Sequence, residues 1–198
     1  MDIQSGGHLA QVRLMDAVST LVPVAAVTYE ESDNRVPFLD QLLPELQADT
    51  GIFFVHWGPH VPGLLQRLKG RNVVYVSYST GYGFDIPPEV PILAGSLHTQ
   101  AYWGRYAYGS PIYHAPCIIT DEFQNRGLPR PIDVLVQKRK NSPYVLNELV
   151  PRLQEQCAVT VLDDWVEDLA LTFNQSKVYL YDSTAHWVGH QLSEGFGL

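Results

Sequence analysis

The sequence predicts an α/β protein with two lobes, each built on a parallel β-sheet. Short runs of strand-forming residues alternate with segments of helical period, which is the pattern of a parallel sheet covered by helices. A segment rich in Pro and Gly, residues 121–131, separates two such series. We therefore expect a first lobe at residues 1–120, a linker at 121–131 and the start of a second lobe at 132–198.

In the first lobe, apolar residues at helical spacing predict a helix near the N-terminus, with Leu9, Val12, Met15 and Val18 on one face. Strands are expected at 22–27, 51–57, 73–77, 92–94 and 111–114, and helices at 38–46, 61–68 and 99–106. The stretch 79–91 is rich in Gly, Pro and Tyr, which predicts a long loop.

In the second lobe, strands are expected at 132–136, 159–162 and 178–181, and helices at 144–154 and 166–173. The first of these helices is well defined, because Leu146, Leu149, Val150 and Leu153 fall on one face. Ligands of parallel sheets bind outside the carboxyl ends of the strands. Functional residues are therefore expected directly after strands, in the segments 57–60, 78–84, 137–140 and 182–198.

The composition is that of a folded globular chain, with 45% apolar and 17% charged residues. A net charge of -8 argues against general nucleic-acid binding, which needs a face rich in Lys and Arg. Cys117 and Cys157 lie in no CxxC or Cys/His ligand pattern, so a reducing cytoplasm is expected. The sequence shows neither a signal peptide nor an apolar run near the roughly 20 residues that span a bilayer. Peripheral membrane contact stays open.

The most distinctive phrase lies at the C-terminus and reads Ser193-Glu194-Gly195-Phe196-Gly197-Leu198. It resembles the start of the donor-sugar motif of family 4 glycosyltransferases, enzymes of the GT-B fold, in which two Glu residues with seven residues between them frame the nucleotide sugar. The resemblance implies that Glu194 is the catalytic residue that contacts the donor sugar. It also implies that the backbone N–H groups of Gly195, Phe196 and Gly197 approach the sugar and the diphosphate.

Two further segments resemble the family. Gly6-Gly7 resembles its first-lobe glycine loop, which lies near the donor phosphates and the acceptor. Arg139-Lys140 resembles the start of its Arg and Lys pair that neutralises the diphosphate, although the family's Lys position is occupied by Tyr144. The strand before the glycine loop and the second Glu are missing from this sequence. The resemblance therefore implies a GT-B-like α/β fold, two Rossmann-like lobes with parallel sheets, both incomplete.

Two first-lobe residues are also candidates for substrate binding. His60 follows a predicted strand, where it would contact substrate or simply line and pack the cleft together with His56 and Trp57. Tyr78 would stack on a sugar or anchor the long loop. The alternatives for the glycine and basic pairs are an ordinary turn and an exposed surface pair. His186 and His190 lack a third ligand, so no metal site is expected.

The resemblance implies transfer of a sugar from a nucleotide sugar, UDP- or GDP-linked, to an acceptor hydroxyl with retention of configuration and without an essential metal or other cofactor. The implied acceptor is a glycan or a lipid-linked intermediate, as in polysaccharide biosynthesis. Exposed sheet edges in incomplete lobes favour a homodimer or poor solubility. The alternatives are an inactive remnant that acts as a binding protein and a nucleotide-sugar epimerase, and whether this chain is itself an active enzyme is left open.

Overall fold

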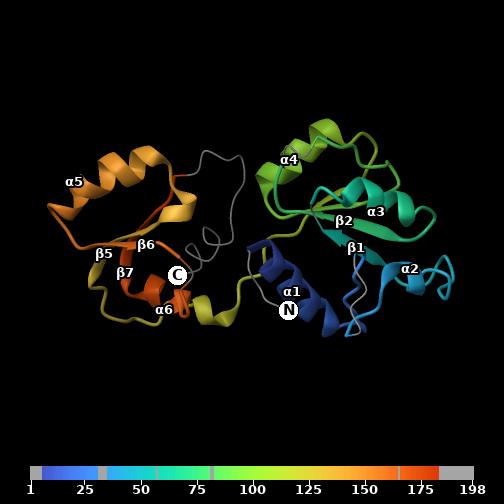
Figure 1. Ribbon diagram of the computed structural model, residues 1–198, viewed down its shortest axis with the longest axis horizontal. Coiled ribbons are helices and arrows are strands. Elements are labelled where there is room, and N and C mark those ends of the chain that lie inside the picture. Colours follow the sequence, from blue (N-terminus) through green and yellow to red (C-terminus); the bar gives the residue numbers. More distant parts are fainter. Residues whose placement is uncertain (1–5, 31–34, 57, 81–82, 165, 183–198) are drawn as a thin grey trace. The chain divides into compact units, whose positions relative to one another are not determined.

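The computed structural model describes residues 6–30, 35–56, 58–80, 83–164 and 166–182 (Figure 1). The protein is a mixed α/β structure with two parallel sheets, which confirms the predicted α/β class with Rossmann-like lobes. The chain divides into two compact units, Met1–Ile118 and Ile119–Leu198, and each contains one of the sheets.

The first unit contains a four-stranded parallel sheet in the order β1-β2-β3-β4. Its strands are β1 Phe53–His56, β2 Val73–Ser77, β3 Ile92–Ala94 and β4 Ile112–His114. Its helices are α1 Gly6–Ser19, α2 Leu39–Leu42, α3 Val61–Arg67 and α4 Leu97–Tyr106. α3 connects β1 to β2 and α4 connects β3 to β4, and Figure 1 shows both on the same side of the sheet. Right-handed crossovers between parallel strands that are added in the same direction place their helices on one face of the sheet.

The core of the first unit lies between its sheet and these helices. Its buried residues are Leu39, Val55, Val61, Leu64, Leu68, Val73, Tyr75, Ile86, Val90, Ile92, Trp103 and Ala107. Trp103 of α4 is 1% exposed and packs edge-on against Tyr75 of β2 with ring centroids 5.6 Å apart. Its indole Nε1 donates a hydrogen bond of 2.8 Å to the hydroxyl of buried Ser77. The bond satisfies a polar group that would otherwise be costly to bury.

Residues 22–27 do not form the predicted strand, although α1 itself is confirmed. Val22 and Val24 stay 52% and 40% exposed, and Pro23 between them has no N–H to donate to a neighbouring strand. Only Thr28 makes a β-bridge, a parallel one with Phe38. β-Branched residues alone therefore do not make a strand here, because no described segment pairs with residues 22–27.

The second unit contains a three-stranded parallel sheet in the order β6-β5-β7. Its elements are β5 Ile132–Gln137, α5 Val150–Gln154, β6 Val159–Leu162, α6 Leu169–Asn174 and β7 Ser176–Leu180. Both faces are covered, because Leu135 packs with Phe173 of α6 and Val136 packs with Val150 of α5. The chain thus runs from β5 to β6 on one side and then crosses to β7 on the other side of β5, as in doubly wound folds.

The predicted helix at 144–154 is confirmed with one irregularity. Residues Val145–Leu149 form a π-helical turn directly before α5. Pro151 lies in the first turn of α5 and has no N–H to donate, so a widened turn before it is physically reasonable.

Segment 121–131, expected as a linker, packs on the second unit. Phe123 is 5% exposed in the cluster with Phe173. Asn174, fully buried, accepts a hydrogen bond of 2.8 Å from the backbone N–H of Arg126 and donates one of 3.1 Å to the carbonyl of Gln124. These bonds attach the extended segment to the end of α6.

Candidate functional site

A pocket of about 380 Å³ opens in the first unit beside the edge strand β1. It is lined by His8, Gln11, Val27, Tyr29, Leu39, Phe53, Phe54, Val55, His56, Gly58, Pro59, His60, Val61, Leu64 and Leu68. Its volume falls in the range of small-molecule sites, and it combines apolar walls with a few polar groups. It also includes the carboxyl end of β1, which is where parallel sheets bind ligands.

His56, the last residue of β1, supplies a largely buried imidazole. Burial lowers the pKa of His56 to about 4, so the ring is neutral at pH 7. Its Nδ1 is buried without a hydrogen-bond partner in the part of the chain that the structure describes. The ring stacks on Tyr78, with centroids 6.3 Å apart and an interplanar angle of 26°. His56 is therefore an uncharged aromatic component of the pocket.

A second histidine, His60, lies at the start of α3 and faces the segment before α2. Its Nε2 is 2.9 Å from Oε1 of Glu30, and its ring centroid is 5.6 Å from that of Tyr29. Burial raises the pKa of Tyr29, and the charge of Glu30 adds to the effect. Since His60 and Glu30 are each about half exposed, their contact contributes little stability and serves mainly to orient the two side chains.

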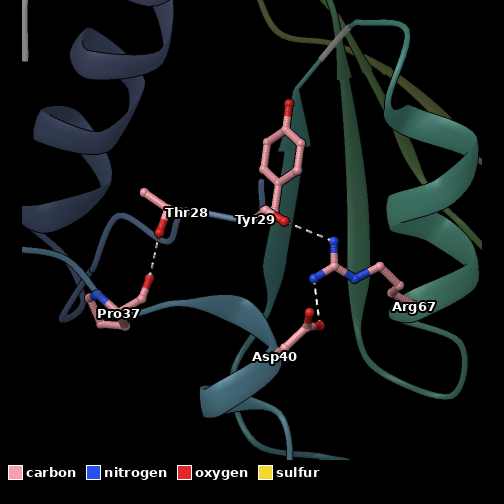
Figure 2. A network of polar contacts seen from close by, with 5 residues as sticks. All are labelled: Thr28, Tyr29, Pro37, Asp40 and Arg67. Atoms are coloured by element: carbon pink, nitrogen blue, oxygen red, sulfur yellow. Dashed lines mark hydrogen bonds and ion pairs between the residues drawn. The ribbon is translucent and has the colours of Figure 1, made fainter. Parts of the chain in front are cut away.

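Arg67 of α3 binds the residues around Thr28 and Tyr29, which are called the Tyr29 segment below (Figure 2). Its Nη1 donates to the backbone carbonyl of Tyr29 at 3.1 Å, and its Nη2 donates to the carboxylate of Asp40 in α2. The neighbouring Thr28 donates its backbone N–H to the carbonyl of Pro37 at 3.0 Å. Figure 2 shows the guanidinium between Tyr29 and Asp40, so one side chain connects the Tyr29 segment to α2 and α3.

Tyr78, predicted to bind substrate, directly follows β2 and is partly buried. Burial raises the pKa of Tyr78 above its usual range, with Cys117 nearby as a lesser cause. Gly95 makes room for its ring, because a Cβ at Gly95 would lie 2.6 Å from Tyr78 Cδ1. Tyr78 thus stacks on the pocket residue His56 and is not itself among the residues that line the pocket.

In the second unit, β5 ends in the turn Lys138–Lys140, in which Lys138, Arg139 and Lys140 are consecutive. β5 is the central strand, and its neighbours β6 and β7 follow it in the sequence on opposite sides, so its carboxyl end is the topological switch point of the sheet. Arg139 is exposed there, and Lys138 Nζ lies 2.8 Å from Asp163, just after β6.

Asn141 connects this turn to β7. Its side-chain nitrogen donates to the carbonyls of Gln137 at 2.8 Å and Leu180 at 3.3 Å, and its side-chain oxygen accepts from the N–H of Asp182 at 2.8 Å. The hydroxyl of Ser142 donates to the Asp182 carboxylate. Because these bonds join the ends of two adjacent strands, they fix the backbone on which the basic residues stand.

The predicted site residues fall into three groups. His60 lies on the pocket, and Gly6 and Gly7 form the start of α1, directly before the pocket residue His8. Arg139 and Lys140 belong to the basic turn of the second unit. The phrase with Glu194, Gly195, Phe196 and Gly197, and also Trp57, lie outside the described residues.

Sequence reasoning missed Gln11, Tyr29 and Glu30. Gln11 lines the pocket from α1, and Tyr29 reaches it from a segment fixed by the bridge at Thr28 and by Arg67. Glu30 is not part of the lining but contacts the pocket residue His60. The local signal for this site in the sequence is His56 at the end of a predicted strand, with His60 directly beyond it.

Within the described ranges, no three His, Cys, Asp or Glu side chains are grouped to hold a metal ion. No helix among the same residues is both long and apolar enough to cross a bilayer. Comparison with models of known families, with curated proteins and with solved structures found no match.

Proposed function

We propose that the chain is a GT-B-type glycosyltransferase, or part of one, that transfers a sugar from a nucleotide sugar to an acceptor hydroxyl with retention of configuration. One observation supports this most: Lys138, Arg139 and Lys140 follow the central strand at the switch point of a doubly wound sheet. Nucleotides bind at this place in such sheets, and a diphosphate needs positive charge there.

The chemistry assigns a role to each part. When the glycosidic bond breaks, negative charge develops on the leaving nucleoside diphosphate, and Arg139 and Lys140 would stabilise it. By resemblance, Glu194 would position the donor sugar, and the backbone at Gly6 and Gly7 would lie near the phosphates. The acceptor would bind in the first unit, beside His60 in the pocket at β1.

Calorimetric titration with UDP, GDP and ADP, and with their glucose conjugates, tests the proposal. We expect one nucleotide to bind and the Arg139→Ala variant to bind it roughly 10- to 100-fold more weakly, as for loss of a charge-assisted hydrogen bond. Arg152→Ala is the matched control, since Arg152 is also exposed in the second unit but lies on α5.

Turnover separates the candidate functions. Sugar transfer or donor hydrolysis that is lost in Glu194→Ala supports the transferase. Nucleotide binding without turnover points to a binding protein, and interconversion of free nucleotide sugars points to an epimerase. If none of the nucleotides binds the unsubstituted chain, the proposal is wrong.

A further inference from the structure

The pocket beside β1 is poor in charged side chains within the part of the chain that the structure describes. None of the described residues that line it is Lys, Arg, Asp or Glu, and its polar groups come from three histidines, Tyr29 and Gln11. Arg67, the cationic residue of α3, donates to the Tyr29 carbonyl and the Asp40 carboxylate. An anion in this pocket would lose its hydration without meeting a counter-charge, which is costly.

The charge around the pocket also disfavours anions. His56 is held neutral by burial, so it offers a polar aromatic ring and no positive charge. His60 already faces the Glu30 carboxylate at 2.9 Å, which balances any charge that the imidazole carries. The carboxylate itself adds negative potential beside the site.

The remaining lining suits a neutral, hydroxylated ring. Tyr29, His56 and His60 present flat aromatic groups, and β1 and α3 add apolar side chains such as Val55 and Leu64. A pyranose has apolar C–H faces and a rim of hydroxyls, which can pack on such groups while bonding to imidazole, amide and phenol.

We propose that this pocket binds the terminal pyranose of a neutral glycan and rejects sugars that carry a carboxylate or phosphate. The inference rests on the proposed function, in which the first unit binds the acceptor, and it specifies the acceptor class. A phosphate-linked lipid acceptor would instead require a cation that the described lining does not provide.

The test records the histidine C–H signals of the full chain by NMR during titration with methyl glucoside, methyl galactoside and methyl mannoside. Glucuronic acid and glucose 6-phosphate are the anionic counterparts. At least one neutral glycoside should shift the His56 and His60 signals, and the anions should shift neither. The His98 signal, from an exposed residue of α4 outside the pocket, should stay in place throughout.

Variants localise the binding. His60→Ala and His56→Phe should each weaken the neutral glycoside roughly 10-fold or more, whereas His98→Ala should leave its affinity unchanged. His56→Phe preserves a ring against Tyr78, and its amide spectrum reports whether the unit still folds.

Two results overturn the inference: no neutral glycoside shifts the pocket signals, or the anions bind as well as the neutral sugars do. Titrating nucleotides into the same samples separates the two proposals. Nucleotide binding without glycoside binding contradicts only the pocket assignment, and glycoside binding without nucleotide binding contradicts only the transferase.

Discussion

In the first unit, the carboxyl end of an edge strand opens on a pocket whose described lining holds no Lys, Arg, Asp or Glu, whereas in the second unit the central strand ends in three consecutive basic residues. Both sheets are parallel, so both concentrate polar groups at the carboxyl ends of their strands. The difference lies in what surrounds each end. β1 has a free side where α1 and the Tyr29 segment line a hollow, while β5 has a strand on each side.

The two ends are also fixed in different ways. The pocket depends on side chains from distant segments, which Arg67 of α3 joins to Tyr29 and Asp40. The basic turn depends on hydrogen bonds between the Asn141 side chain and the backbone at the ends of β5 and β7. A short basic phrase can therefore be recognised in the local sequence, whereas a pocket built from distant segments cannot.

The largest expected effect tests whether each unit depends on its own core. Trp103→Ala should cost about 3–5 kcal/mol of unfolding free energy, because it removes a buried ring and the bond to Ser77. Leu135→Ala should cost about 2–5 kcal/mol in the second unit, where Leu135 is fully buried. Amide hydrogen exchange should quicken in β1–β4 for the first variant and in β5–β7 for the second.

Trp103→Phe is the control for the first variant, since it keeps a ring but loses the indole N–H. Its smaller loss of stability would separate packing from the hydrogen bond. If either core substitution quickens exchange equally in both sheets, the units do not unfold separately.

The sequence predicts those features of the two units that depend on residues close together in the chain, and it misses those that depend on tertiary contacts. Strands such as 73–77 and 132–136 and the helix at 144–154 are predicted because their periodicity is local. The expected strand at 22–27 is wrong because pairing depends on a partner that local sequence does not specify. Likewise, the position of Arg139 directly after a strand can be read from the local sequence, but Tyr29 reaches the pocket, and Glu30 reaches His60, only through tertiary contacts.

A second prediction uses the pH dependence of stability to distinguish the two units. The pKa of His56 is about 4 in the folded state and near 6.5 unfolded, so the unfolded state binds more protons between these values. Stability should therefore fall as pH drops from about 6.5 to 4, by roughly 3 kcal/mol at most. In the second unit, hydrogen bonds from Lys177 and the Ala158 N–H lower the pKa of Asp133. Its stabilisation is present above pH 3.8 and is lost only as the pH falls below that value.

Urea unfolding at a series of pH values between 7 and 3 measures both effects. His56→Phe should flatten the change between pH 6.5 and 4, and Asp133→Asn should alter only the more acidic part. A His56→Phe profile that matches that of the unsubstituted chain contradicts the assignment of that window to His56.

The smallest expected effect concerns the packing of Tyr78 against the pocket residue His56. Gly95→Ala places a Cβ 2.6 Å from the Tyr78 ring, which must then move, and we expect a loss of about 1–2 kcal/mol. Gly104→Ala is the matched control, because nothing lies within 4 Å of its Cβ and Ala is favoured over Gly inside α4 by about 1 kcal/mol. Thermal unfolding should therefore shift in opposite directions for the two variants. Because Tyr78 stacks on His56, only Gly95→Ala should also move the His56 C–H signal in the NMR spectrum. An unmoved signal would mean that Tyr78 does not position His56, and the pocket would then depend on the Arg67 contacts alone.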